Sequence, residues 1–282
     1  MENFLDKFFF RSRNLDHISK NLKNITYKTH ANKIFEAINS YSESSEVRYV
    51  GGCIRKIIKN EEVDDIDFAT NLNPSDVSEA LKKKEINYYE TGIEHGTLTA
   101  IIDEHKFEIT SLRKDVVTDG RHAKIEFSSD WQEDAARRDF SINSIYADKK
   151  GNLFDPYNGK KDLEDGYIKF IGNAENRIKE DYLRILRYIR FFANYSNHKH
   201  NPEIIKIIKR NIDGVSKLSS ERLLDEFKKL TKSDGFIKLF NDKESLELIE
   251  IIFPQLKNLN SFKKLNSYAH NNLFKVDFIF LL

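Results

Sequence analysis

The sequence predicts an α+β protein, in which an α/β head is followed by an all-helical part, and two features of its 282 residues lead to this prediction. Short apolar or alternating runs, typical of strands, are concentrated between about Val47 and Gly172. From about Ala174 onward, apolar residues recur every three or four positions, as in amphipathic helices. We therefore expect a head over residues 1–173 and a helical neck and body over residues 174–282.

The individual elements follow from the same two patterns. A helix is expected over Ser75–Lys84, because Pro74 suits the first helical turn and Asp76 is an acid near the helix start. The expected strands of the head are Val47–Val50, Ile66–Ala69, Thr97–Ile102, Phe107–Leu112 and Tyr167–Ile171. The expected helices of the second part are Asp181–Tyr195, Pro202–Lys209, Ser220–Leu230 and Phe236–Phe240.

Composition sets limits on the class of protein. Hydrophobic residues make up 39% and charged residues 32% of the chain, which is typical of a soluble globular protein with helical content. One cysteine and no secretory signal pattern predict a reducing, cytoplasmic location. No apolar run approaches the roughly 20 residues that a membrane helix needs, so we expect no membrane contact. The net charge of +1 does not indicate a nucleic-acid partner, and the basic stretch from Lys199 to Lys232 is more typical of solvated helix faces than of a binding surface.

A glycine turn follows the first expected strand. Val50 leads into Gly51-Gly52, and Cys53, Ile54 and Arg55 then open a helix. Backbone N–H groups at such a helix start can bind a phosphate, and glycine lets the phosphate approach closely. Arg55 can add a positive charge there. A Gly-Gly pair alone is weak support, because most such pairs are only tight turns.

Asp65-Ile66-Asp67 strengthens the functional interpretation. On a strand, residues two apart point to the same face, so the two carboxylates converge while Ile66 enters the core. Like charges this close favour a bound cation, and carboxylate oxygens select Mg²⁺ or Mn²⁺. Two such ions can activate an attacking hydroxyl and stabilise a leaving pyrophosphate. The alternative is an exposed acidic turn, which the upstream glycine turn makes less attractive.

Two arginine-rich segments are the remaining candidates. Arg137-Arg138-Asp139, with Asn143 downstream, is either a surface ion-pair patch or a site in which Arg138 binds phosphates and Asp139 and Asn143 lie near a ribose.

The segment from Glu180 to Arg190 carries Asp181, Arg184, Arg187 and Arg190 at intervals of three, which predicts one charged helix face. That face is either a solvated, salt-bridged surface or a protein template for bases. A carboxylate and a guanidinium can pair with the amino-plus-acceptor edge that cytosine and adenine share, and reject guanine and uracil.

At these residues the sequence resembles the class II tRNA nucleotidyltransferase and bacterial poly(A) polymerase family. The matching motifs occur in order over roughly residues 47–195. They are the segments 51–55, 65–67, 91–97, 119–122, 133–143, 155–159 and 180–187, and Ser220-Glu221-Arg222 with Glu226-Phe227 resembles a later helical motif.

The resemblance implies a polymerase-β-like nucleotidyltransferase head, a mixed sheet with helices, followed by an all-α neck and body that hold tRNA. It implies that Asp65 and Asp67 are the catalytic residues and bind two Mg²⁺ ions. It places Asp139 and Asn143 near the ribose and assigns segment 111–122 to a flexible loop needed for the switch from C to A. The residues that would contact the incoming CTP or ATP are Gly52, Arg55, Arg138, Asp181, Arg184, Arg187 and Arg190.

Further expectations concern Glu108, Cys53, His95 and the end of the chain. Alternation permits Glu108 to supply a third carboxylate to the metal ions but does not require it. Cys53 is expected to be a packed thiol and His95, which follows Glu94, a structural hydrogen-bonding residue. The apolar end Phe280-Leu281-Leu282 and the short length lead us to expect a truncated or split member that lacks a full tail domain.

The expected function is CCA addition to tRNA 3′ ends from CTP and ATP, with release of pyrophosphate. A poly(A) polymerase or a partial CC- or A-adding enzyme would share most of these motifs, although the absence of a basic C-terminal extension and the complete spacing of segment 111–122 favour CCA addition. A truncated RNA-binding remnant without activity is the alternative from another class, and the retention of both Asp65 and Asp67 argues against it. A nucleotidyltransferase for small molecules would leave Asp181 and Arg184 without a purpose.

Overall fold

The computed structural model describes residues 17–116, 124–233 and 235–256. The chain divides into two compact units, with the division between Glu164 and Asp165. Every helix within the described ranges is too short or too polar to cross a membrane. Residues 280–282, from which we expected an incomplete tail, lie outside the described residues.

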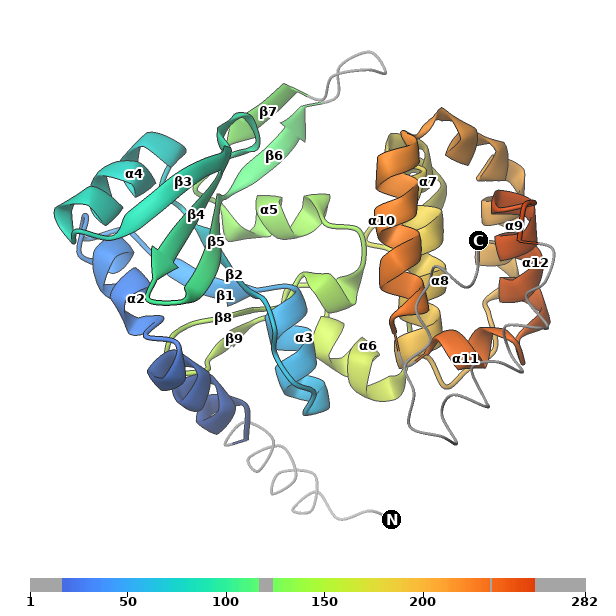
Figure 1. The fold of residues 1–282 in the computed structure, drawn as a ribbon, viewed down its shortest axis with the longest axis horizontal. Coiled ribbons are helices and arrows are strands. Elements are labelled where there is room, and N and C mark those ends of the chain that lie inside the picture. Colours follow the sequence, from blue (N-terminus) through green and yellow to red (C-terminus); the bar gives the residue numbers. More distant parts are fainter. Residues whose placement is uncertain (1–16, 117–123, 234, 257–282) are drawn as a thin grey trace. The chain divides into compact units, whose positions relative to one another are not determined.

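The first unit is built on a seven-stranded mixed sheet with the order β3-β4-β5-β2-β1-β8-β9 (Figure 1). The central pair β2 and β5 is parallel, and every other pair of neighbouring strands is antiparallel. The predicted mixed sheet with helices is confirmed. The strands are β1 (Val47–Val50), β2 (Ile66–Thr70), β3 (Asn87–Gly92), β4 (Thr97–Ile102), β5 (His105–Ser111), β8 (Tyr146–Ala147) and β9 (Leu153–Phe154).

Helices cover the core face of this sheet. They are the helical residues 17–28, α2 (Asn32–Asn39), α3 (Gly52–Lys59) and α4 (Pro74–Lys83). Apolar residues from these helices pack in one cluster with alternate residues of the strands, such as Phe68 and Phe107. The predicted start of α4 is confirmed, since Asn73 accepts a hydrogen bond from the Asp76 N–H at 3.0 Å and Pro74 follows the cap.

The opposite face of the sheet is covered only in part. There, Val50, Ala69 and Tyr146 pack with Ala135 of α5 in a smaller apolar cluster. The ribbon formed by β6 and β7 is antiparallel and separate from the main sheet (Figure 1). The remaining elements of the head are β6 (Arg113–Val116), β7 (Lys124–Phe127), α5 (Trp131–Arg137), η1 (Ile93–His95), η2 (Ser141–Asn143) and α6 (Gly159–Asp165).

The second unit is helical in its described residues beyond Ala174, as predicted. Asn201 and Ser219 cap their helices by accepting hydrogen bonds from the N–H groups of Glu203 and Arg222. The helices are α7 (Ala174–Glu180), α8 (Leu183–Tyr195), α9 (Pro202–Asn211), η3 (Ile212–Lys217), α10 (Ser220–Thr231), α11 (Phe236–Leu239) and α12 (Lys243–Ile252).

The strand predicted over Tyr167–Ile171 is wrong. Only Phe170 takes part in a bridge, and none of these residues belongs to the seven-stranded sheet. Their alternation has another cause, because the aromatic rings pack on the helical unit. Tyr167 stacks on His198 at 4.2 Å and Phe170 on Tyr188 at 5.9 Å between ring centroids.

Candidate active site

The glycine turn lies where the sequence placed it, between β1 and α3. Gly51 has φ +69°, a conformation that favours glycine, and Gly52 is the first residue of α3. Two guanidinium groups flank the turn. A Cβ placed on Gly51 would lie 3.8 Å from Nη1 of Arg138, and one placed on Gly52 would lie 3.8 Å from Nη2 of Arg55. The turn therefore combines the N–H groups of a helix start with two fixed positive charges.

A buried chain of polar groups holds Arg55. Its Nη1 donates to Oδ1 of Asn143, whose Nδ2 donates to Oδ1 of Asp139 at 2.8 Å. The same Asp139 oxygen accepts the N–H of Phe140 at 2.9 Å. Arg55, Asp139 and Asn143 are all buried, so these hydrogen bonds satisfy groups that water does not reach. The structure thus brings three of the predicted site residues together.

Arg138 is held by a residue that the sequence analysis did not single out. Asp134 is only 1% exposed, and its Oδ2 accepts hydrogen bonds from Arg138 Nη2 at 2.9 Å and from the Tyr146 hydroxyl at 2.6 Å. Arg137 binds the other oxygen at 2.6 Å. Burial alone would favour the neutral acid, but Arg138 and Arg137 outweigh it and hold the pKa of Asp134 well below its usual range. The two arginines are therefore no exposed surface patch.

The acidic pair lies beside the glycine turn. Asp67 is half-buried on β2, Ile66 enters the core as predicted, and Asp65 is exposed in the connection that precedes the strand. Glu108 on β5 is the register partner of Asp67, so the third carboxylate that alternation permitted does lie on the same face. Burial, together with the charges of Glu108 and Asp65, raises the pKa of Asp67 to about 6, although Arg138 and Arg55 act in the opposite direction.

This donor set fits a hard divalent cation. Burial, with the charges of Glu108 and Asp65 next, makes the ionised form of Asp67 costly, and a cation would relieve this cost. Carboxylate oxygens are the ligands that Mg²⁺ prefers. Within the described residues, no three Asp, Glu, His or Cys side chains already converge on one metal position. The residues thus fit a metal ion by their chemistry and their charge.

The neighbouring motif residues have structural surroundings. Cys53 is buried, its Sγ donates to the Val50 carbonyl at 3.3 Å, and burial raises the pKa of its thiol to about 12, as expected for a packed thiol. The His95 side chain is 67% exposed and lies 3.9 Å from Glu94. Its structural role belongs to its carbonyl, which accepts a hydrogen bond from Arg113.

Segment 111–122, the predicted flexible loop, is described only in its first half. Arg113–Val116 is strand β6, paired with β7, and residues 117–122 lie outside the described residues.

The motif of residues 155–159 positions the segment that carries Asn143. Asp155 accepts the N–H groups of Gly159 and Lys160 at 2.7 and 2.9 Å, which fixes the start of α6. A Cβ on Gly159 would collide with the carbonyl of Ser141, so only glycine lets α6 approach η2. Because η2 carries Asn143, this contact positions the partner of Arg55.

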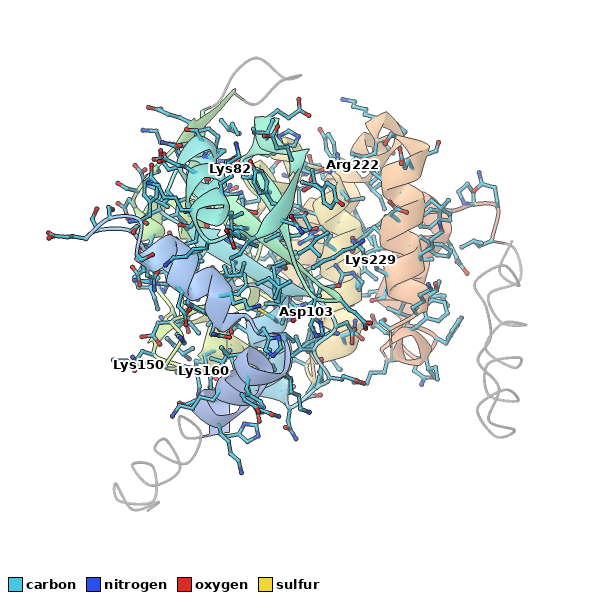
Figure 2. All side chains as sticks on the ribbon, turned by 60° about the vertical axis from the view of Figure 1, so that its left-hand side comes forward. Lys82, Asp103, Lys150, Lys160, Arg222 and Lys229 are labelled. Atoms are coloured by element: carbon cyan, nitrogen blue, oxygen red, sulfur yellow. The ribbon has the colours of Figure 1, made fainter. Side chains whose placement is uncertain are left out.

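In the second unit, Asp181 lies outside the helix on which it was predicted. It occupies the break between α7 and α8, where its Oδ1 accepts the Leu183 N–H at 3.1 Å. The extended backbone at Asp181 ends α7 and prevents one continuous stripe with Arg184 and Arg187. Its Oδ2 accepts from Arg222 at 2.8 Å, and Arg222 lies on α10 (Figure 2).

The three arginines of α8 are each engaged by the protein. Arg184 donates to Glu180 at 2.6 Å and to the Arg177 carbonyl at 2.8 Å. Arg190 donates to Oε1 of Glu226 at 2.5 Å, and Arg187 lies 4.0 Å from the other Glu226 oxygen. Glu226 is only 3% exposed. This face of α8 is therefore partly buried and joined to α10, in contrast to the solvated helix of the alternative interpretation.

The sequence matches two described families. Residues 47–169 match the "Poly A polymerase head domain", and residues 200–259 match the "Probable RNA and SrmB-binding site of polymerase A". The chain is 40% identical over 228 residues to the mitochondrial CCA tRNA nucleotidyltransferase 1 of Homo sapiens, covering 79% of this chain and 52% of that protein. The chain belongs to the tRNA nucleotidyltransferase and poly(A) polymerase family.

Other members of the family agree with this assignment. A CCA-adding enzyme of Lactobacillus johnsonii is 36% identical over 197 residues, which are 69% of this chain and 48% of that enzyme. The crystal structure of the Bacillus stearothermophilus CCA-adding enzyme in complex with CTP is similar with a TM-score of 0.65 and 26% identity, over 77% of this chain and 50% of that one. The chain spans about half the length of the curated relatives it matches.

The fold and one part of the chemistry follow from family membership. The first unit has the polymerase-β-like head of the nucleotidyltransferases, and CCA-adding enzymes generally use divalent metal ions. Asp134 and Glu226 lie in motif segments of the sequence, but no role was predicted for them, and Tyr146 was not named. Asp134 precedes Arg138 by four residues, which is a helical ion-pair spacing that could have found it. The roles of Tyr146 and Glu226 could not be read from local spacing, because their partners come from other elements.

Proposed function

We propose that this chain adds C, C and A to the 3′ ends of tRNA from CTP and ATP, with release of pyrophosphate. The observation that carries the proposal is the juxtaposition of the Asp67 and Glu108 carboxylates with a glycine turn flanked by two guanidiniums. This arrangement suits transfer of a phosphoryl group, in which positioning and charge stabilisation do most of the work. The names of the relatives support the substrate.

The triphosphate is assigned to the glycine turn. The N–H groups at the start of α3, with Gly52, face a region of positive charge from Arg55 and Arg138. Asp134 and Tyr146 fix the Nε and Nη2 edge of Arg138. Its Nη1 lies near the turn and donates to the Asn143 carbonyl at 3.4 Å. Asp139 and Asn143 are assigned to the ribose side and also hold Arg55 in place.

The metal ions are assigned to Asp65 and Asp67, with Glu108 as a further ligand. Two Mg²⁺ ions, when bound, would supply the counter-charge for these carboxylates, for the attacking 3′-hydroxyl and for the leaving pyrophosphate. The protein contributes a half-buried Asp67 whose backbone carbonyl accepts from Cys53 Sγ at 3.8 Å and whose flanking residue Ile66 is anchored in the core. Removal of divalent ions by EDTA should therefore abolish nucleotide addition.

Base selection is assigned to Asp181 and Arg184, with Arg187 and Arg190 as further nucleotide contacts. Asp181 is held by Arg222 and by its own helix cap, and Arg184 by Glu180, so both side chains are pre-ordered. A carboxylate that accepts and a guanidinium that donates match the edge common to cytosine and adenine. In this proposal Arg190 acts mainly through Glu226, because its guanidinium is largely buried against that residue.

The partner and the location are proposed in the same terms. The head over residues 1–173 is assigned the chemistry, and the neck and body over residues 174–282 are assigned tRNA, with basic side chains on α9 and α10 such as Lys229 (Figure 2). The cytoplasmic location stays a prediction from the single cysteine, and the name of the human relative places that protein in mitochondria.

The experiment uses the full chain, Mg²⁺ and a tRNA that lacks its 3′ end, with each nucleotide triphosphate alone and in combination. Products are read at single-nucleotide resolution, and Asp67→Asn serves as the blank. Addition of C, C and A that stops there is the expected result. A long A tail would instead establish a poly(A) polymerase, and addition of only C residues or only A would establish a partial enzyme. No addition by folded protein would contradict the proposal.

A further inference from the structure

The geometry of phosphoryl transfer sets the direction from which RNA must approach. The attacking and leaving oxygens lie roughly in line on opposite sides of the phosphorus. In the proposed function, the glycine turn that follows β1 binds the leaving pyrophosphate. The carboxylates lie on the next strands, β2 and β5, so the attacking 3′-hydroxyl comes from the far side of the carboxylates, over β4 and β3. This step rests on the proposed function.

The strand register places four paired residues in a row across that part of the sheet. Asp67 pairs with Glu108, Glu108 with Thr99, and Thr99 with Tyr89. All four side chains belong to the face opposite the main core, because their neighbours Phe68, Phe107, Leu98 and Tyr88 pack into that core. Figure 1 shows β5, β4 and β3 side by side. With strands about 4.8 Å apart, Tyr89 lies roughly 14 Å from Asp67.

The surface along this row is polar and ends in an exposed ring. The Thr91 and Thr99 hydroxyls meet at 2.8 Å, and those of Thr97 and Thr110 at 3.0 Å. Tyr89 is 62% exposed on the edge strand β3, where the register shifts just beyond it. The Tyr89 ring does not belong to the hydrophobic core, whereas the adjacent Tyr88 packs against it.

We infer that Tyr89 is a stacking platform for a base of the RNA strand that precedes the 3′-terminal nucleotide. An exposed aromatic ring stacks on any base, so it would guide the strand without reading its sequence. The distance from the carboxylates places the ring beyond the terminal ribose, which suits a primer-strand contact and not a contact with the incoming nucleotide. Of the nearby threonines, Thr91 is exposed, so its side chain can also reach the sugar–phosphate backbone.

The test compares the full-length chain with Tyr89→Ala, Tyr89→Phe and Tyr27→Ala. Tyr27 is a matched control, since it is a tyrosine of the same unit that is 81% exposed and far along the chain from β3. Nucleotide addition gives KM for RNA and KM for CTP. In EDTA, anisotropy of a 5′-labelled tRNA that lacks its 3′ end gives the dissociation constant independently of activity.

Tyr89→Ala should raise the KM and the dissociation constant for RNA about tenfold, equivalent to about 1.4 kcal/mol, with KM for CTP unchanged. Tyr89→Phe keeps the ring and should behave as wild type, as should Tyr27→Ala. An RNA affinity of Tyr89→Ala within about twofold of wild type would overturn the inference and leave the proposed function standing. If wild type adds no nucleotide but binds RNA through Tyr89, the proposed function fails alone. If wild type binds no RNA, both fail.

Discussion

At the scale of residues, the site depends on charges that the protein pairs unequally. Asp134 is buried and has two guanidiniums and a hydroxyl as partners, so it is firmly ionised. Asp67 is half-buried among two further carboxylates and is raised in pKa. The first arrangement fixes Arg138 in one orientation. The second leaves a carboxylate whose negative charge is costly without a cation, as expected for the proposed metal site.

Asp67→Asn should therefore stabilise the protein in EDTA. The folded pKa of Asp67, about 6, lies above the ordinary value of 3.8, so the folded state holds the proton more tightly than the unfolded state. This contribution is fully present below pH 4 and is lost as the pH rises through 6. At pH 7 the variant should be more stable by up to about 3 kcal/mol, and at pH 4 equally stable. Urea unfolding as a function of pH measures this difference, and a difference that does not change between pH 4 and 7 would contradict it.

At the scale of elements, the periodic patterns predicted helix bounds and strand faces, which depend on residues close together in the chain. The apolar spacing after Pro202 and Ser220 predicted α9 and α10 to within two residues, and alternation placed Asp67 and Ile66 on opposite faces of β2. The two-residue strands β8 and β9 are too short to show a period.

The features that the sequence patterns did not predict depend on contacts between residues far apart in the chain. The pairing of Asp67 with Glu108 depends on the register between strands 41 residues apart, which spacing cannot give. Asp181 was placed on a helix because its interval to Arg184 fits a helical repeat, but its extended backbone is decided by the cap of α8 and by Arg222 on another helix. The alternation at Tyr167–Ile171 arises because Phe170 packs on α8. A sequence pattern does not distinguish such packing from a strand.

Glu226→Gln should weaken the connection between α8 and α10. Glu226 is a buried counter-charge of Arg190 and lies near Arg187, so its neutralisation removes a buried ion pair and its charge-assisted hydrogen bond. We expect a loss of about 3 kcal/mol or more in the free energy of unfolding. Asp225→Asn, on the same helix but 62% exposed, is the control and should change stability by less than about 0.5 kcal/mol. Equal effects of the two substitutions on the free energy of unfolding in urea would show that the buried pair stabilises the protein no more than an exposed one.

At the scale of the whole molecule, the two compact units carry different parts of the proposed function. The carboxylates and the glycine turn belong entirely to the first unit, and Asp181, Arg184 and the buried Glu226 belong to the second. Each unit has buried apolar residues of its own, such as Phe68 in the first and Phe227 in the second. Under the proposed function, chemistry and choice of base can therefore be altered separately, and the chain itself would select C and A without a nucleic-acid template.

The most direct test of this claim is the rate of incorporation from each of the four nucleotide triphosphates by wild type and by Asp181→Asn. Asparagine keeps an oxygen for the Leu183 N–H but replaces one acceptor with a donor, which suits the carbonyl of uracil. Wild type should use CTP and ATP and reject UTP and GTP, and the variant should raise the ratio of UTP to CTP use about tenfold while remaining dependent on Mg²⁺. An unchanged ratio in an active variant would contradict base selection by Asp181.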